Sequence, residues 1–342
     1  MRTVTKARPS DDRGVVLVWV ATTLTVLLGM GALVLDVGAL YQERRELQNG
    51  ADAAALAVAK DCAAGDCLDE MSTAGHFADE NANDGASDVA LVCGEGPGLI
   101  ACPDPPPEAD GTSGWVRVDT TTLEPGGGTQ IDYLLAPVLD AANVGKTVSA
   151  SAVAAWGPAG GATTIPLIFS ECEYIEAGGN VRADPPVFPE DEITIYLHSS
   201  EQAGFCGAGP AGAELPGGFG WLANDDCEVT ITADDTVGVD TGNDVPNGCD
   251  PATWQDAVVV IPIFDSASGT GAGGEYHIAG FVGFHVTGYR FPGERWPAGF
   301  DCPEAPGGSG ACISGYFTEI TIPDGGFGGG TDYGAHIVKM IG

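Results

Sequence analysis

The stretch LQNGADAAALAVA, residues 47–59, follows an uncharged run of 21 residues, VVLVWVATTLTVLLGMGALVL, at 15–35. At about 1.5 Å per residue, a helix over 15–35 is about 31 Å long, the thickness of a bilayer's hydrocarbon core. Beyond this run, apolar residues recur at steps of three, four and seven through the quoted stretch. The sequence therefore predicts one helix over residues 14–60, with a transmembrane first half and an amphipathic extension outside the membrane.

A common turn pair, Asn49-Gly50, lies inside this predicted helix. The pair forms a hairpin turn where strand-like alternation flanks it. Alanines and charged helix formers flank it here, so we predict a weak point or bend in a helix. The alanine-rich face of residues 51–59 allows another helix to approach closely, which predicts packing against the protein's own head or a neighbouring subunit.

Basic residues flank the uncharged run unequally, with four before it and two, Arg44 and Arg45, just after it. Lys and Arg favour the cytoplasmic side of a membrane, so we expect a cytoplasmic tail at 1–13 and an extracytoplasmic body, held in the cell membrane by a single span. A cleaved signal peptide is the alternative, because Val37-Gly38-Ala39 satisfies the small-residue cleavage rule. The length of the uncharged run favours an uncleaved anchor.

The charge of the chain is concentrated beyond this helix. Residues 1–60 contain 7 Lys and Arg and 6 Asp and Glu, whereas residues 61–342 contain 6 and 42. A field of that sign repels phosphates, so the composition argues against nucleic-acid binding by residues 61–342. The simplest interpretation is a surface kept soluble by excess carboxylates.

Ten cysteines and no CxxC pair favour disulfides in an oxidising compartment over a zinc ribbon or a thioredoxin-like site. Short spacings predict three local pairs and leave four cysteines to pair among themselves. The local candidates are Cys62 with Cys67, Cys93 with Cys102 and Cys302 with Cys312, and the remaining ones are Cys172, Cys206, Cys227 and Cys249.

The N-terminal segment resembles the TadE/TadG-like family of Flp (tight-adherence, or Tad) pilus-assembly proteins. The residues that carry the resemblance are Arg13-Gly14, the apolar run, Asp36-Val37-Gly38, Leu40-Tyr41, Arg44-Arg45, Leu47-Gln48-Asn49 and Ala51-Asp52-Ala53-Ala54-Ala55-Leu56-Ala57. The resemblance implies a single N-terminal membrane helix, an exterior body and a part in building Flp-type pili. It also implies the lipid bilayer, reached through residues 15–35, and other pilus-assembly or envelope proteins as partners.

Two departures from related patterns limit what the resemblance implies. Type IV pilins have a glutamate at the fifth position of the mature chain, and counting from Gly14 that position is Trp19. This favours an uncleaved accessory protein over a major pilin. Some larger TadG-like proteins also carry a D-x-S-x-S metal site. The corresponding stretch here, Asp265-Ser266-Ala267-Ser268-Gly269, lacks both required serines, so no metal site is carried over.

The rest of the chain predicts an α+β fold in two parts. Residues 61–157 form a small α+β head, 158–162 a glycine-rich linker, and 163–342 a β-rich, disulfide-containing exterior domain of antiparallel, sandwich-like type. Within the head we expect helices at 66–84 and 134–142 and strands at 88–93, 115–122 and 147–156. The helix at 66–84 would bury an apolar side made of Leu68, Met71, Ala74 or Gly75, and Ala78.

Candidate chemical sites are weak throughout. Two histidines on one predicted strand, His277 and His285, would lie about 26 Å apart, too far to share a metal, so both should face solvent. The segment Gly307–Ala311 misses the G-x-S-x-G pattern by its last residue and lies between two cysteines. An aromatic cluster is expected to be sheet core rather than a sugar or partner surface; its members are Phe281, Phe284, Tyr289, Phe291 and Trp296.

The sequence thus predicts a protein that is structural rather than an enzyme, without a cofactor or metal, that takes part in Flp/Tad-type pilus assembly or surface display. A surface adhesin or envelope-binding module is the alternative, with the same anchor and a ligand on the C-terminal sheet. A membrane-tethered hydrolase is a further alternative. It would need a convergent triad or metal cluster, and the sequence contains none that stands out.

Overall fold

The computed structural model describes residues 13–104, 106, 112–134, 136–139, 142, 144–183, 186–189, 191–197, 219–224, 226–240, 244–269, 273–302, 310–323 and 325–341. The chain divides into two compact units. Unit 1 contains residues 1–54, 74–91 and 118–152, and unit 2 contains residues 55–73, 92–117 and 153–342. The predicted tail at 1–13 lies outside the described residues except for Arg13.

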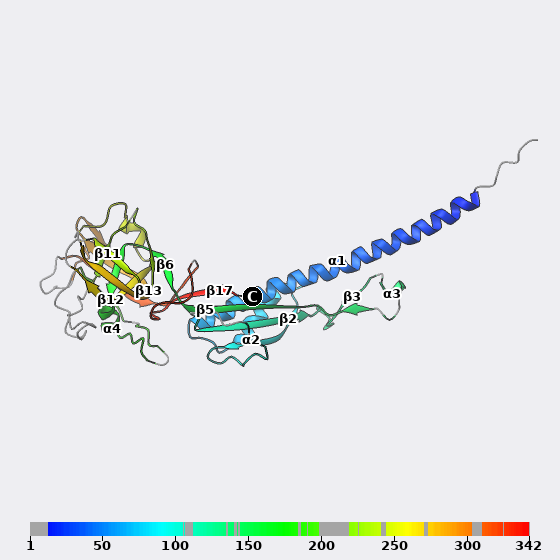
Figure 1. The fold of residues 1–342 in the computed structure, drawn as a ribbon, viewed down its shortest axis with the longest axis horizontal. Coiled ribbons are helices and arrows are strands. Elements are labelled where there is room, and N and C mark those ends of the chain that lie inside the picture. Colours follow the sequence, from blue (N-terminus) through cyan, green and yellow to red (C-terminus); the bar gives the residue numbers. More distant parts are fainter. Residues whose placement is uncertain are drawn as a thin grey trace, which may run out of the picture. The chain divides into compact units, whose positions relative to one another are not determined.

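The predicted N-terminal helix is confirmed as α1, a single helix of 51 residues at Arg13–Ala63 (Figure 1). Asn49 and Gly50 are both helical. A β-carbon at Gly50 would lie 3.2 Å from the carbonyl oxygen and 3.3 Å from the Cα of Ala78, on helix α2 (Glu70–Glu80). The glycine predicted as a weak point is therefore a place where a second helix comes close to the backbone of α1.

Helix α2 is shorter than the predicted helix at 66–84, and its buried face differs from the expected one. Leu68 precedes the helix and is 81% exposed, and Met71 in its first turn is 51% exposed, so both assignments to the apolar side were wrong. The buried residues of α2 are Ala74 and Ala78. Small side chains replace large ones because α2 approaches α1 closely. Gly85, at φ +72°, takes the left-handed conformation just beyond the helix.

A five-stranded sheet contains the strands predicted for the head and two strands from the C-terminus. Its order is β1 (Ser87–Glu95), β2 (Gly114–Thr122), β5 (Ser149–Pro158), β17 (Ala335–Met340) and β16 (Ile320–Ile322). The strands β1, β2 and β5 confirm the predictions. Strand β17 was not predicted. In unit 2 it runs antiparallel to β5, from His336 opposite Pro158 to Met340 opposite Ala154.

The helix predicted at 134–142 is a single turn, α3 (Ala136–Leu139), at the end of a small hairpin in unit 1. The two hairpin strands are β3 (Ile131–Asp132) and β4 (Gly145–Lys146), which pair antiparallel. The hairpin continues one step further, since the Tyr133 N–H donates to the Val144 carbonyl oxygen at 2.9 Å. A short helix of this kind has few internal hydrogen bonds and depends on outside partners.

The β-rich C-terminal part is confirmed, with an eight-stranded sheet in unit 2. Strand β11 pairs with β9, β9 with β7, β7 with β12, β12 with β13, and β13 again with β11, so these pairings close into a ring. Most pairings are antiparallel, and β7 with β12 is parallel. The ring strands are β7 (Leu167–Ser170), β9 (Phe219–Leu222), β11 (Thr236–Asp240), β12 (Val258–Ser268) and β13 (Glu275–Phe291).

The remaining elements of unit 2 border this ring. Strands β15 (Cys312–Thr318), β8 (Ile193–Tyr196) and β14 (Glu294–Trp296) extend the sheet from β13, and β6 (Gly161–Thr164) pairs with β10 (Val229–Thr232). A 3₁₀ turn, η1, occupies Pro251–Trp254. The segment ECEY directly after β7 belongs to helix α4 (Glu171–Glu176), whose N-terminus is capped by the Ser170 side chain, which accepts the Cys172 N–H.

The predicted aromatic cluster forms part of the core of unit 2. Phe281, Phe284, Tyr289 and Phe291 are at most 3% exposed, and Trp296 packs against the same core. The ring of Phe284 meets that of Phe169 edge to face at a centroid distance of 4.9 Å. These aromatic side chains therefore stabilise the sheet and are not a ligand surface.

Candidate functional site

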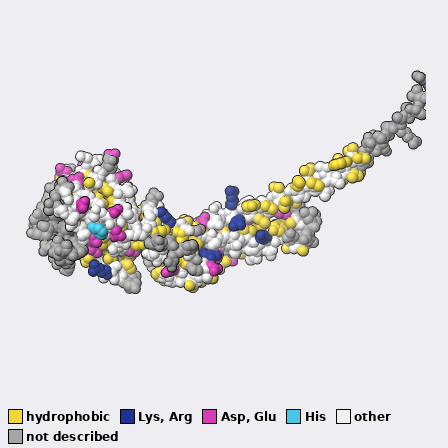
Figure 2. All heavy atoms as spheres, in the orientation of Figure 1, with side chains coloured by type: hydrophobic (Ala, Val, Ile, Leu, Met, Phe, Trp, Pro, Cys, Tyr) yellow, Lys and Arg dark blue, Asp and Glu magenta, His cyan; other side chains and the backbone are white. Residues whose placement is uncertain are grey.

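The first half of α1 presents an apolar surface to its surroundings. Every Val, Leu, Met and Trp side chain described in residues 15–35 is 55–71% exposed. Two threonine hydroxyls inside the run return to the helix backbone, from Thr22 to Val18 and from Thr25 to Ala21, both at 2.9 Å. Among the helices that the structure describes, α1 alone is long and apolar enough to cross a membrane. Figure 2 shows these side chains along the helix.

The second half of the same helix buries its small residues. Leu47, Ala51 and Ala54 are at most 3% exposed, and the buried face continues at the same spacing through Ala55, Val58 and Ala59. Alanine has no side-chain rotamers to lose on burial and lets backbones approach closely. The predicted packing face is therefore present, and within unit 1 its partners are α2 and the sheet.

Side chains fix the register between α1 and the sheet of unit 1. The buried Thr120 hydroxyl on β2 donates to the Leu47 carbonyl oxygen at 3.0 Å. On α1, Gln48 donates through its amide nitrogen to the Ser151 carbonyl oxygen of β5 at 3.1 Å and to the Asp52 carboxylate at 2.7 Å. These bonds join the helix to two neighbouring strands, so sliding of the helix by one turn breaks them.

Two acidic residues of α1 face the other elements of unit 1. The Glu46 carboxylate accepts the Asn83 N–H at 3.2 Å and is also hydrogen-bonded to the Asn83 side-chain amide, just after α2. Burial raises the pKa of Glu43, and the nearby carboxylates of Glu46, Asp84 and Glu124 raise it further, against a hydrogen bond from Thr122 that lowers it. The acidic side of the helix is thus also a packing surface.

At the end of the uncharged run, Asp36 connects α1 to the β3–β4 hairpin. The residue is only 7% exposed, and its two carboxylate oxygens accept the backbone N–H groups of Leu134, at 2.8 Å, and Ala136, at 2.7 Å. Sequence reasoning placed Asp36 in the family pattern but missed this contact. The available signal was that Asp36 is the first charge after 21 uncharged residues.

Comparison with known families supports the same segment. Residues 14–61 match the Tad family model, described as "Putative Flp pilus-assembly TadE/G-like". This agrees with the resemblance found from the sequence. No curated protein and no solved structure matches the chain.

The Tad-like segment, residues 14–61, coincides almost completely with α1. It includes both the exposed apolar half and the buried alanine half. The family pattern therefore covers a membrane-type helix together with its packing extension, and the sheets of the body lie outside it.

The structure contains the three local disulfides named from the sequence, Cys62–Cys67, Cys93–Cys102 and Cys302–Cys312. Of the four cysteines left open, Cys227 joins Cys249, Cys172 is disulfide-bonded, and Cys206 lies outside the described residues.

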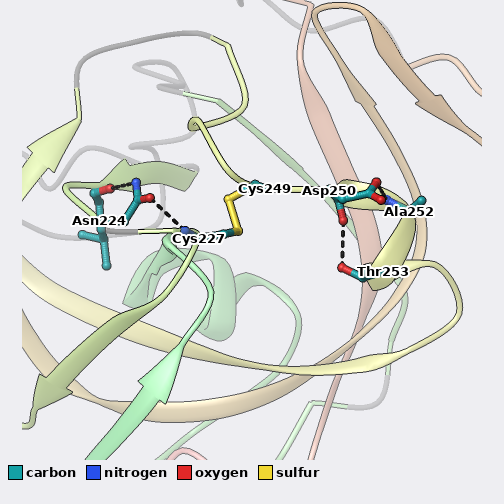
Figure 3. Close-up of a disulfide and its surroundings, with 7 residues drawn as sticks. Asn224, Cys227, Cys249, Asp250, Ala252 and Thr253 are labelled. Carbon is teal, nitrogen blue, oxygen red and sulfur yellow. Dashed lines mark hydrogen bonds between the residues drawn. A yellow bond between two sulfur atoms is a disulfide. The ribbon is translucent and has the colours of Figure 1, made fainter.

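Figure 3 shows the Cys227–Cys249 bridge between two hydrogen-bonded loops. Asn224 accepts the Cys227 N–H at 3.3 Å, and the Asp250 carboxylate accepts the Ala252 N–H at 3.0 Å and so caps η1. The disulfide ties this turn to the loop before β10.

The two histidines of β13 do not come together. His277 Nδ1 lies 2.8 Å from the Asp265 carboxylate, and His285 Nε2 lies 3.4 Å from that of Asp256. Both side chains are partly exposed, at 35% and 20%. His285 stacks on Tyr316, at a ring-centroid distance of 4.8 Å. Each ring thus has a separate structural contact.

Within the described part of the chain, no group of three or more His, Cys, Asp or Glu side chains is arranged to hold a metal ion. The G-x-S-x-G-like segment lies mostly outside the described residues, which resume at Gly310. A cavity of about 390 Å³ in unit 2 is lined by the acidic residues Asp226, Glu228 and Asp250 and by Trp254. It is open and acidic, and its described lining contains no arrangement typical of a nucleophile with its base.

Proposed function

We propose that this protein is a single-pass membrane protein that takes part in Flp/Tad-type pilus assembly as a structural component. The observation that carries the proposal is the Tad-like segment, which matches the family model and forms one helix with an exposed apolar half and a buried alanine half. In this proposal residues 1–13 are cytoplasmic, residues 15–35 cross the bilayer, and the acidic body is extracytoplasmic and held by its partners in the envelope.

The mechanism follows from the continuity of α1. No loop separates the apolar half from the packed half, so the orientation of the packed sheet in unit 1 is coupled to the membrane span. An α-helix resists bending because each turn is hydrogen-bonded to the next. The helix can therefore hold an assembly component at a fixed height above the membrane. Its role is mechanical, and no step of bond making or breaking is required.

A deletion experiment in the source organism tests this proposal. We expect surface pili to be lost on deletion and restored by the complete chain, while the protein stays in the membrane fraction after pili are sheared off. A point variant serves as the control for complementation. Leu68→Ala changes an exposed side chain outside the Tad-like segment and should restore pili fully. Normal piliation in the deletion strain contradicts the proposal.

A surface-binding role for residues 163–342 is the second candidate, and the acidic cavity beside Trp254 is the observation that favours it. Binding of the purified full-length protein to immobilised envelope glycans tests this role. Loss of binding in Glu228→Gln, at an exposed position of the cavity lining, with piliation intact, supports the second candidate; absence of binding by the wild-type protein contradicts it.

A further inference from the structure

The β3–β4 hairpin of unit 1 has an apolar tip that the proposed function leaves unexplained. We call the described residues 133, 134, 136–139, 142 and 144 the hairpin tip; none of them is charged. Leu134 is 71% exposed and Val144 is 55% exposed. In a water-facing loop such side chains are unusual next to each other. The tip is joined to α1 by the two hydrogen bonds at Asp36.

One residue inside the uncharged run, Ala32, is buried on the face of α1 that carries Asp36. Ala32 is 6% exposed, whereas the adjacent Leu33 is 65% exposed. Ala32 and Asp36 are four residues apart and share one face of α1. The hydrogen bonds at Asp36 hold Leu134 and Ala136 against this face, one helical turn from the buried Ala32, and Figure 1 shows β3 and α3 beside α1. Ala32 lies three residues inside the uncharged run, about 4.5 Å from its end.

We propose that the hairpin tip enters the outer boundary of the bilayer beside α1, so that the protein contacts the membrane at two places. The inference rests on the membrane anchoring in the proposed function. If residues 15–35 span the hydrocarbon core, Leu134 and Ala136, which are bonded to Asp36 directly after that run, lie at its outer boundary. The exposed Leu134 and Val144 then face lipid and not water.

Three backbone N–H groups of the hairpin tip have hydrogen-bond partners, as a segment in lipid requires. An N–H group without a partner is costly in hydrocarbon. The N–H groups of Leu134 and Ala136 donate to Asp36, and that of Tyr133 donates to Val144. Ala136 is the first residue of α3, so Asp36 accepts a hydrogen bond at the helix start, where N–H groups have no internal partners. These hydrogen bonds explain why a carboxylate, that of Asp36, is buried at the end of the proposed membrane span.

Basic and aromatic side chains lie on the side of the tip away from the span. Tyr41, Arg44 and Lys146 line a cavity of about 330 Å³ together with apolar residues of α1 and the start of β5. Neither Arg44 nor Lys146 forms a salt bridge with any residue that the structure describes. Apolar side chains followed by tyrosine and free cations match the order of hydrocarbon, interface and phosphate in a lipid monolayer.

Depth-dependent fluorescence quenching of the full-length protein in phosphatidylcholine liposomes tests the proposal. A bimane probe is placed at Leu134→Cys or, as the matched control, at His76→Cys on α2. His76 has a 65% exposed side chain on the helix that contacts Gly50, about 21 Å further along α1 than Asp36. The unsubstituted protein treated with the same dye sets the background. We expect nitroxide-labelled lipid to remove most of the Leu134 signal and aqueous iodide most of the His76 signal.

A second variant links the result to the hairpin contact. Adding Asp36→Ala to Leu134→Cys removes both acceptors, and the lipid quenching at Leu134 should fall towards the His76 value while the protein still floats with liposomes. Equal quenching of the Leu134 and His76 probes in protein that floats with liposomes overturns the proposal and leaves the anchoring intact. Protein that does not float with liposomes overturns both this inference and the anchoring in the proposed function.

Discussion

The two halves of α1 belong to one helix, yet they meet their surroundings in opposite ways. In residues 15–35 the large apolar side chains are exposed, whereas in residues 47–63 small alanines are buried. A water-soluble domain does the reverse, because large apolar side chains gain most from burial. In the proposed function, the first half of the helix contacts lipid and the second half contacts protein.

Charging the lipid-facing half should have the largest effect. Leu24→Arg with Leu28→Arg places two charges on one face in the middle of the span, at about 3 kcal/mol each. We expect the variant to be lost from the membrane fraction. Leu68→Arg with Met71→Arg, at two exposed positions outside the span, is the matched control and should fractionate like wild type. Retention of the Leu24/Leu28 variant in alkali-washed membranes contradicts the assignment of the span.

The close packing of the second half of α1 can be tested by comparing a substitution at Gly50 with the same substitution at Gly38. A β-carbon at position 50 would already lie 3.2 Å from the backbone of Ala78, so the larger side chain of Gly50→Leu should overpack the contact and destabilise the fold by about 1–3 kcal/mol. A β-carbon at Gly38 would have no atom within 4 Å, and Gly38→Leu improves helix propensity. Thermal unfolding in detergent should show a lower Tm for Gly50→Leu alone. An equal Tm for both variants excludes close packing at Gly50.

A smaller loss is expected from the hydrogen bond between β2 and α1. Thr120→Val keeps the shape of the buried side chain and removes its donor to the Leu47 carbonyl, for an expected loss of about 1 kcal/mol in the free energy of unfolding. Thr121→Val is the control, because the Thr121 hydroxyl bonds to Asp88 at the surface. Chemical denaturation of the two variants measures the difference. A larger loss for Thr121→Val argues against the register described for α1.

The smallest effect concerns Glu319, a glutamate of unit 2. Burial raises the pKa of Glu319 and Asp332 raises it further, while His336 lowers it. A raised pKa in the folded state means that stability is complete at low pH and declines as pH rises through the unfolded-state pKa towards the folded-state one. Glu319→Gln resembles the protonated form, so its Tm should exceed that of wild type at pH 8 and equal it near pH 3. A constant difference at both pH values contradicts the pKa direction.

The sequence predicted the elements that depend on local pattern. Twenty-one uncharged residues, followed by apolar residues at steps of three and four, are sufficient to predict α1. The alternation of apolar and polar residues is sufficient to predict β5 and β13. The cysteine pairs present in the structure at separations of 5, 9 and 10 residues are also local. Each of these signals is contained in a short window of the chain.

Contacts between distant residues could not be predicted in this way. The pairing of β17 with β5 joins segments about 180 residues apart, and period-two alternation identifies a strand without naming its partner. The bonds from Asp36 to Leu134 and Ala136 are distant in the same sense. Leu68 and Met71 were misplaced because helical spacing marks them as one face, whereas close approach at Gly50 admits only small residues there.

The central claim is that one unbroken helix passes from lipid into protein. A nitroxide spin-label scan along residues 15–60 of the full-length protein in bilayers, with accessibility to oxygen and to a water-soluble nickel complex, tests it directly. We predict high oxygen and low nickel accessibility throughout 15–35, then low accessibility to both every three or four residues through Ala51, Ala54 and Val58, with no interruption at Asn49-Gly50. Nickel accessibility within 15–35, or loss of the helical period at Gly50, would contradict this claim.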